Sequence, residues 1–338
     1  MDIKYSVLDL ATVIEGHTPA ETFPRSLELA QTAEKLGYSR FWLAEHHNMI
    51  SVASSATAVL IGYIAGGTST IRVGSGGIML PNHAPLIVAE QFGTLASIYP
   101  NRIDLGLGRA PGSDQLTALE IRGQNYYQPH NFPADIQKLQ TLFSAENAGA
   151  KVRAIPGEGL DVPIWILGSS TDSARVAAAL GLPYAFASHF APTYFLEAIE
   201  LYRRQFRPSK HLSEPYVMAC VNVVAADTDV EAERLATSLK HLFIGVITGQ
   251  RKLLQPPSDH MTWAPLEEQA VNQMLAYSFI GSKEPLKTKL DAFVEKTGVN
   301  EIMATSHIFD QGARLHSYVL FSQVINELNM VHEGQQKI

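Results

Sequence analysis

A repeated alternation of apolar runs with helical patterns constrains the fold of this 338-residue chain more than any other feature. Eight short apolar runs are typical of buried parallel strands, and a stretch with helical spacing follows each. The first helical stretch, 22–36, has one apolar face and ends at Gly37. The strands are expected at 5–8, 40–44, 71–74, 103–107, 164–167, 184–187, 217–224 and 301–304. The helices are expected at 22–36, 54–65, 85–98, 133–143, 173–180, 194–205, 229–242, 283–297 and 313–328.

Eight strand–helix pairs predict an α/β fold, a (β/α)₈ TIM barrel formed by residues 1–338 as one domain. A doubly wound open sheet shows a similar alternation and remains the alternative to the barrel. The chain exceeds the usual barrel length of about 250 residues, so insertions are expected. The stretch 247–272 has too many prolines for one helix, and it is predicted to be a lid over the site or a surface excursion.

Composition and charge exclude several classes of partner. The formal net charge is −7, without a basic run, which argues against nucleic acids and anionic membranes as partners. No segment reaches the length of a membrane span, and the first apolar run begins too early for a signal peptide. Cys220 is the single cysteine and lies in an apolar stretch, so a buried, inert thiol and a cytoplasmic location are expected.

The loop Gly-Ser-Ser-Thr-Asp-Ser at 168–173 joins an expected strand to an expected helix. Free backbone N–H groups and the helix dipole at such a junction attract anions, and the hydroxyls of Ser169, Ser170 and Ser173 add donors. An ordinary helix cap uses the same residue types and remains the alternative for the loop alone. Arg109 follows the fourth expected strand and could pair with a phosphate or form a surface salt bridge.

Protonatable side chains follow the second expected strand, in the run Glu45-His46-His47. Adjacent strand residues point to opposite faces, so both histidines cannot ligate one metal from a regular strand. No HxxxH or CxxC pattern accompanies them, and no metal is predicted. One histidine is expected to face the pocket as a general acid or base, but the alternation does not decide which face lines the barrel. Further polar strand ends are Asp9, 188–189 and 305–307.

Glycines interrupt the third expected strand at 74–77, where Gly74, Gly76 and Gly77 flank Ser75. Glycine costs backbone entropy in a strand, so we expect a close approach of backbone to a flat ligand. The run Gly-Leu-Gly-Arg-Ala-Pro-Gly at 106–112 lacks the glycine spacing of the dinucleotide fingerprint. The sequence therefore does not predict NAD(P) held by a Rossmann motif.

Taken in order and spacing, four stretches resemble the bacterial luciferase-like flavin monooxygenases: 41–47, 71–81, 90–92 and 101–109. The resemblance covers most of 1–328 and implies a (β/α)₈ barrel with FMN at the carboxyl ends of the strands. It implies that His46 is the catalytic base and that a non-prolyl cis peptide at Gly76–Gly77 packs on the flavin ring. It also implies that the FMN phosphate binds to Arg109 and to Ser169, Ser170 and Ser173.

The sequence differs from luciferase itself at two positions. Gly108 stands where luciferase has a reactive cysteine, and Ser169 stands where it has a glutamate, so light emission with a long-chain aldehyde is not expected. We predict an FMN-dependent monooxygenase that uses reduced flavin and O₂ to oxidise a small organic substrate. A partner flavin reductase and a homodimer belong to this prediction. The alternatives are a deazaflavin-dependent hydride-transfer oxidoreductase, a flavin-binding protein without turnover, and a barrel hydrolase using His46.

Overall fold

A parallel sheet forms the centre of the computed structural model, which describes residues 2–335. Eight of its strands close into a barrel in the order β1, β2, β3, β5, β6, β7, β8, β10. The ring closes because β10 pairs with β1 on one side and with β8 on the other. The strands are β1 (Lys4–Asp9), β2 (Arg40–Leu43), β3 (Arg72–Ser75), β4 (Ile78–Met79), β5 (Ile103–Gly108), β6 (Ile164–Gly168), β7 (Tyr184–Phe186), β8 (Val217–Ala225), β9 (Ser278–Gly281) and β10 (Glu301–Thr305).

This closure confirms the predicted (β/α)₈ barrel, and the open doubly wound sheet is wrong. All eight expected strands are present within a few residues of the expected bounds. Two short strands were missed. β4 continues along β5 where β3 ends, and β9 pairs with the carboxyl half of β8, from Asn222 to Ala225. Both extend the barrel wall at its carboxyl end. β4 is too short to produce a sequence pattern, and β9 is only half buried and lacks an apolar run.

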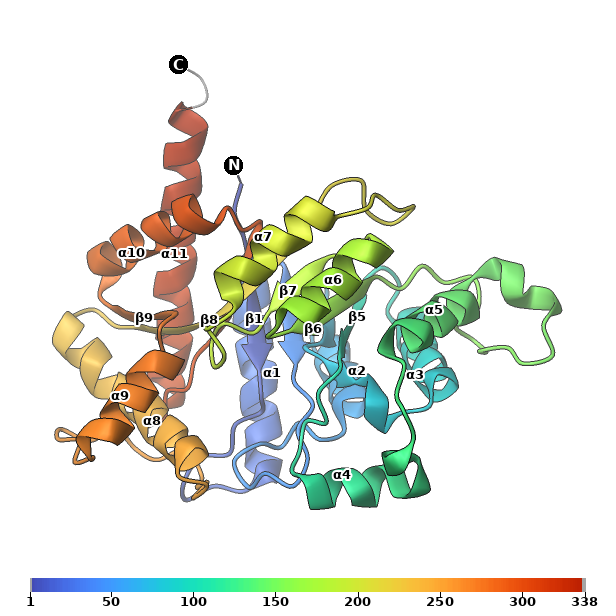
Figure 1. Ribbon diagram of the computed structural model, residues 1–338. Helices are drawn as coiled ribbons and strands as arrows, with labels where there is room; N and C mark the ends of the chain where they lie inside the picture. The colour runs from blue at the N-terminus through green and yellow to red at the C-terminus, as the bar shows by residue number, and fades with distance from the viewer. Residues whose placement is uncertain (1, 336–338) are drawn as a thin grey trace.

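Helices surround the barrel, and every expected helix is present (Figure 1). α4 and α9 were not expected, and Figure 1 shows both at the lower end of the molecule, away from the two termini. None of the described helices is long and apolar enough to cross a membrane. The α-helices are α1 (Pro19–Lys35), α2 (Thr57–Gly66), α3 (Pro85–Ile98), α4 (Gln115–Arg122), α5 (Phe132–Phe143), α6 (Thr171–Leu180), α7 (Phe195–Gln205), α8 (Asp229–Ile247), α9 (Pro265–Met274), α10 (Lys283–Thr297) and α11 (Gln311–Gln335).

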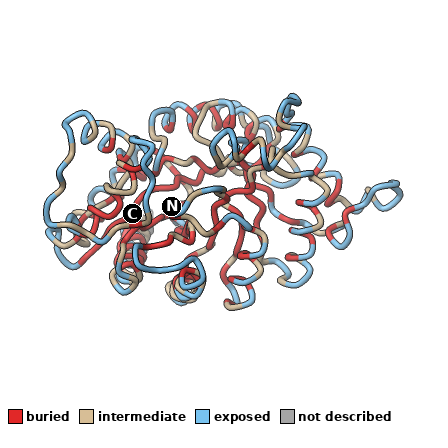
Figure 2. Tube along the Cα trace, turned by 90° about the horizontal axis from the view of Figure 1, so that it is seen from below, coloured by how far each residue is buried: buried red, intermediate tan, exposed pale blue. Residues whose placement is uncertain are grey.

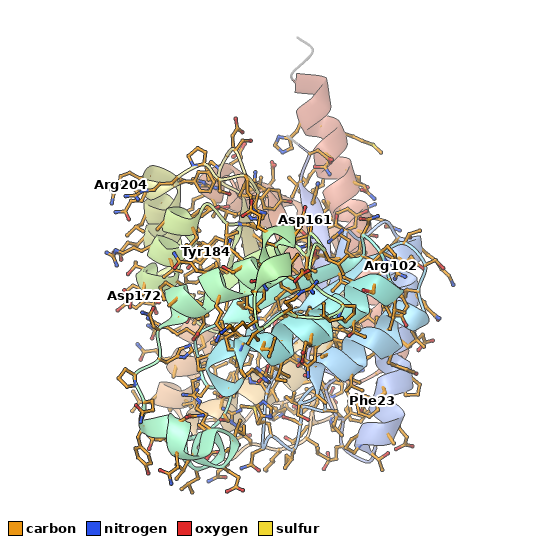
Figure 3. All side chains as sticks on the ribbon, turned by 90° about the vertical axis from the view of Figure 1, so that its right-hand side faces the viewer. Phe23, Arg102, Asp161, Asp172, Tyr184 and Arg204 are labelled. Carbon is orange, nitrogen blue, oxygen red and sulfur yellow. The ribbon has the colours of Figure 1, made fainter. Side chains whose placement is uncertain are left out.

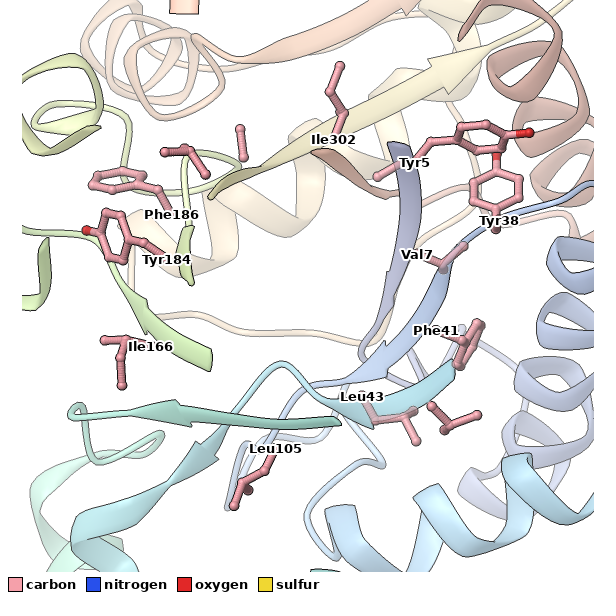
Figure 4. Packing of buried hydrophobic residues seen from close by; sticks show 14 of the residues in the cluster. Tyr5, Val7, Tyr38, Phe41, Leu43, Leu105, Ile166, Tyr184, Phe186 and Ile302 are labelled. Atoms are coloured by element: carbon pink, nitrogen blue, oxygen red, sulfur yellow. The ribbon is translucent and has the colours of Figure 1, made fainter. Parts of the chain in front are cut away.

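The side chains of each barrel strand alternate between the helices and the barrel interior. Phe41 and Leu43 of β2 point outward into the main hydrophobic core, as Figure 4 shows. Trp42 and Ala44 point inward and join a smaller cluster with Trp165. Figure 2 shows the result along the chain, with buried segments at the centre and exposed segments around them. Because successive side chains of a strand point to opposite faces, the barrel has one hydrophobic core between the strands and the helices and a second, smaller one inside the barrel.

Paired charges fill the amino-terminal end of the barrel. The guanidinium of Arg40 lies 2.8 Å from Asp104 and 3.1 Å from Glu301, and both carboxylates are fully buried. Arg72 lies 2.6 Å from the second oxygen of Asp104. Arg40 also lies 4.6 Å from the centre of the Trp165 ring, a cation–π distance. These paired side chains occupy the amino end of the barrel.

The stretch 247–272 contains two different structures. Residues 248–264 form a loop, in which Leu254 is buried and exchanges backbone hydrogen bonds with Val13 and Glu15. From Pro265 onward the chain forms α9, whose Val271 is fully buried against α8. The predicted stretch 247–272 therefore includes buried core residues, Leu254 and Val271, and the part of it without regular secondary structure is 248–264.

Candidate functional site

A cavity of about 450 Å³ opens at the carboxyl end of the barrel. Its floor consists of apolar side chains inside the barrel, among them Leu8 and Trp42, and its volume suits a small organic ligand. Every site residue predicted from the sequence lines it: His46, Gly76, Gly77, Arg109, Ser169, Ser170 and Ser173. The structure therefore brings together residues from four different strand ends.

One side of the cavity combines a cation with a helix N-terminus. Arg109 follows β5, and Ser170 caps α6 without a side-chain capping bond. α6 begins at Thr171, two residues earlier than expected, so Ser173 lies within its first turn. The Ser173 hydroxyl is already engaged, because it donates to the Ser170 carbonyl at 2.7 Å and lies 3.0 Å from the Tyr184 hydroxyl.

Asp172 is the one carboxylate in this turn, and it lies between two arginines. Its oxygens are 3.4 Å from Arg109 and 3.4 Å from Arg175. All three side chains are about half exposed (Figure 3 labels Asp172), so these pairs are weak. Two cations against one anion leave a net positive charge beside the free N–H groups of α6. This part of the cavity can therefore hold a phosphate.

The glycine run at the end of β3 fits tightly against β5. The Gly76–Gly77 peptide is cis, as the family resemblance implied. A Cβ atom on Gly77 would lie 2.8 Å from the Gly106 carbonyl oxygen, and one on Gly74 would lie 2.5 Å from that of Asp104. These glycines are thus required by a close approach of two strands, which corrects the expectation that a flat ligand alone explains them. Gly76 and Gly77 nevertheless present their backbone to the cavity.

Glu45 fixes the loop that carries the two histidines. Its buried carboxylate lies 2.8 Å from His47 Nε2 and 2.9 Å from His83 Nε2, and it accepts the Met79 N–H at 3.0 Å. Burial alone would raise the pKa of Glu45, but the bonds from His47 and His83 outweigh burial and lower that pKa from 4.5 to about 2. Glu45 therefore ties the end of β2 to β4 and to the segment after it.

The two adjacent histidines have different surroundings. His47 is held by Glu45, whereas His46 lines the cavity together with Trp42 and Ala44 of the same strand face. His46 Nδ1 is buried and has no hydrogen-bond partner among the described residues. Burial lowers the pKa of His46, and the positive charge of Arg251 lowers it further. A neutral His46 ring therefore lines the cavity at pH 7, with a lone pair on one ring nitrogen.

The opposite wall of the cavity comes from β7, β8, β10 and α8. It includes His189, His307 and Cys220. Burial lowers the pKa of His189 to about 3 and, with the charge of Arg314, that of His307 to about 4. Cys220 is buried, as expected, and burial raises its pKa well above the usual value. At pH 7 these groups are all uncharged.

Sequence reasoning noted His189 and His307 as polar strand ends but did not select them. It missed the buried contact between Glu45 and His83, which fixes the end of β2. It also missed Arg251, which lines the cavity from the loop 248–264. A strand-end position was the only signal for the two histidines, and nothing distinguished Arg251 from other surface cations. Within residues 2–335, no three His, Cys, Asp or Glu side chains are grouped so as to hold a metal ion.

Comparisons with known proteins identify relatives over the whole barrel. A family model described as luciferase-like monooxygenase matches residues 3–301. A luciferase-like monooxygenase of Escherichia coli (strain K12) is 50% identical over 328 residues, which cover 96% of this chain and 98% of the relative. The N-acetyl-S-alkylcysteine monooxygenase of Bacillus subtilis (strain 168) is 37% identical over 260 residues, which cover 74% and 75% of the two chains.

Solved structures give the same result. The crystal structure of apo-MsnO8 is 36% identical, has a TM-score of 0.88, and covers 96% of this chain and 98% of its own. The FMN complex of a type II Baeyer–Villiger monooxygenase, the oxygenating constituent of 3,6-diketocamphane monooxygenase from Pseudomonas putida, has a TM-score of 0.70, 19% identity and coverage of 96% and 97%. An F420-dependent secondary alcohol dehydrogenase has a TM-score of 0.68, 15% identity and coverage of 96% and 98%. The last two similarities show the fold alone.

Proposed function

This chain belongs to the luciferase-like monooxygenase family, and we propose from that premise that it is an FMN-dependent monooxygenase. In this proposal, reduced FMN and O₂ are co-substrates, and a small organic molecule is oxidised. The observation that carries the proposal is the convergence of Arg109, the N-terminus of α6 and the Gly76–Gly77 backbone on one cavity. A cation with free N–H groups suits the phosphate, and the glycine backbone suits the face of a flat ring.

The charges support a bound phosphate. Asp172 would repel an anion if it stood alone, but Arg109 and Arg175 both pair with it and leave an excess positive charge. The Ser170 hydroxyl is not used as a cap and is free to donate to a ligand. Ser169 lies in the same lining, whereas Ser173 keeps the loop shape through its own hydrogen bonds. We therefore assign the phosphate to Arg109, Ser169, Ser170 and the first turn of α6.

The remaining lining supports an oxidation that needs protection from water. Reduced FMN, when bound, supplies the two electrons with which one oxygen atom of O₂ enters a substrate while the other leaves as water. The apolar side chains of Trp42, Leu167 and Met303 exclude water from the cavity. His46, which is neutral because desolvation lowers its pKa, takes up a proton at a ring nitrogen and so serves as the general base.

A flavin-binding experiment tests the proposal. The protein is titrated with FMN, riboflavin, FAD and F420, and binding is followed by flavin fluorescence. Arg109→Ala should weaken FMN about 10- to 100-fold, the range for one charge-assisted contact of 1.5–3 kcal/mol, and leave riboflavin unchanged because it lacks the phosphate. Arg204→Ala, an exposed arginine at the end of α7, is the matched control.

Three outcomes contradict the proposal in different ways. If Arg109→Ala weakens the binding of FMN and riboflavin equally, Arg109 does not bind the phosphate. Binding of F420 in preference to FMN favours a hydride-transfer oxidoreductase, the cofactor class named in one structural relative. FMN binding without substrate-dependent O₂ consumption favours a flavin-binding protein without turnover. Thioethers are the first substrates to test, because one relative is named for an S-alkylated cysteine.

The proposal extends to partners and to a lid. We propose that a separate reductase supplies reduced FMN, so the purified protein should not oxidise NADH. We propose a homodimer through α2 and α3, because α2 has no charged residue and Val59 and Ile98 are exposed on these helices. Light scattering should then give twice the mass of 37.0 kDa. We also propose that 248–264 closes the cavity, with Arg251 at its inner side.

A further inference from the structure

The wall of the cavity across the barrel from His46 has no charged side chain among its lining residues. Its members come from β7, β8, β10 and α8, and the charged lining residues, Glu45, Arg109 and Arg251, lie on other elements. Met218, Met303 and Phe243 give this wall an apolar, polarisable surface. A ligand group that enters here leaves water without finding a counter-ion, so it must be uncharged.

Among the polar side chains of this wall, His189 has a ring nitrogen whose hydrogen bonding is unsatisfied. It is 9% exposed, and its Nδ1 has no hydrogen-bond partner among the described residues. Its position is fixed in other ways: the Asn222 amide donates to its carbonyl at 2.6 Å, and its ring packs edge to face on Phe190 at 4.8 Å. The ring is thus held in place while its hydrogen-bonding capacity is left for a ligand.

Two other polar atoms of this wall have contacts within the protein. His307 Nδ1 lies 3.5 Å from the Thr12 hydroxyl, and the Cys220 carbonyl accepts the Ser188 hydroxyl at 2.6 Å. Because burial holds the pKa of His189 near 3, its ring carries one N–H at pH 7. A buried N–H group without a hydrogen-bond partner destabilises the fold more than a buried lone pair without one. We therefore place the proton of the His189 ring on Nε2 and the lone pair on the enclosed Nδ1.

We infer that His189 anchors the organic substrate by donating an Nε2–H hydrogen bond to an uncharged acceptor oxygen, such as a carbonyl, ether or sulfoxide oxygen. The rest of the substrate is apolar and packs against Met218, Met303 and Phe243. His189 is in this view a specificity-determining residue, distinct from His46 on the opposite side. The inference rests on the proposed function, because only an enzyme has a substrate. The binding of an acceptor oxygen by His189 itself requires neither flavin nor turnover.

Two probes of the same shape test this recognition. Acetophenone carries a C=O where α-methylstyrene carries a C=CH₂, so they differ in the acceptor alone. Dissociation constants are measured by ligand-observed NMR on the protein with and without FMN. The wild-type protein should prefer acetophenone by about tenfold, the upper end for one neutral hydrogen bond. No preference in the wild-type protein overturns the inference without any variant.

Variants assign the preference to a residue. His189→Phe keeps an aromatic ring against Phe190 but removes the donor, so both probes should bind equally. His189→Gln retains a donor at about the same reach and should keep most of the preference. His211→Phe, on the loop before β8, is the matched control and should behave as wild type. A preference that survives in His189→Phe, or that disappears only in His46→Phe, contradicts the assignment.

Failure of this inference is separable from failure of the proposed function. If FMN does not bind, the proposed function fails, while the probe preference can still be measured on the protein alone. If FMN binds and O₂ is consumed but the probes show no His189-dependent preference, the inference fails alone. Thermal melting of each variant, with and without FMN, identifies a folding defect. Should His189→Phe be unfolded, His189→Leu takes its place.

Discussion

Replacing Glu45 with glutamine should destabilise the protein by about 3 kcal/mol at pH 7. The carboxylate is 1% exposed and accepts bonds from His47, His83 and the Met79 N–H, and its pKa falls from 4.5 to about 2 on folding. A difference of about 2.5 pKa units at 1.36 kcal/mol each corresponds to roughly 3 kcal/mol of free energy of unfolding. A glutamine amide at this position would carry no charge and would present N–H donors to the histidines.

The pH dependence identifies the cause of the loss. The pKa of Glu45 is lower in the folded protein, so the unfolded chain takes up this proton first as the pH falls. The contribution is therefore complete above about pH 5 and is lost as the pH falls from 4.5 toward 2. The difference in free energy of unfolding between wild type and Glu45→Gln should fall from about 3 kcal/mol at pH 7 to about 2 kcal/mol at pH 3.5.

Urea unfolding followed by tryptophan fluorescence measures both values. Glu120→Gln is the matched control, because Glu120 is exposed on α4, and its free energy of unfolding should change by less than about 0.5 kcal/mol. A loss below about 1 kcal/mol at pH 7 would show that the buried carboxylate does not hold this loop. A loss of the same size at both pH values would show that its charge is not responsible.

Two further predictions concern catalysis. His46→Ala should reduce turnover by roughly 10²–10⁴ while FMN affinity stays unchanged, whereas His47→Ala should lower the free energy of unfolding by about 1–3 kcal/mol, because a buried carboxylate loses a partner. Loss of turnover in His47→Ala alone would reverse the two roles. Leu254→Ala should loosen the proposed lid and raise the hydrogen peroxide released per product, with the exposed Leu266→Ala as control. If the amount of hydrogen peroxide released per product does not change, the loop 248–264 is an ordinary surface loop and not a lid.

The barrel could be predicted from the sequence because its strands are buried on both faces. Runs such as Ile164–Gly168 are apolar throughout, which distinguishes them from the helices that follow. β4 could not be predicted, since two residues carry no period. β9 is as long as β2, but its sequence Ser-Phe-Ile-Gly is only half buried and does not form the apolar run that marks the other strands. α9 was hidden by the prolines before it, although Pro265 stands at its first turn, where proline is tolerated.

The site could be predicted in part, because parallel strands bring their carboxyl ends to one place. That rule, with the family resemblance, selected seven residues that all line the cavity. Strand alternation alone could not separate His46 from His47, since it gives two faces without saying which is inside, and it was the family resemblance that selected His46. The decision comes from Glu45, whose partners His83 and Met79 lie more than 30 residues further along the chain. A contact between distant segments leaves no local pattern.

Both ends of the barrel bury paired charges, such as Asp9 with Arg314 at the carboxyl end, but within residues 2–335 only the cavity at the carboxyl end is lined by buried histidines that are held neutral. At the amino end, Arg40, Arg72, Asp104 and Glu301 are buried as pairs, so each keeps its charge. At the carboxyl end, His189 and His307 are buried without a carboxylate partner within hydrogen-bond reach among the described residues, and burial therefore holds them neutral at pH 7. A carboxylate beside either ring would raise its pKa and place a charge in the cavity. Asp9 acts to raise the pKa of His307, but it is itself paired with Arg314 at 2.8 Å, so its charge is offset and both histidines stay neutral. We therefore expect the substrate to enter the barrel uncharged.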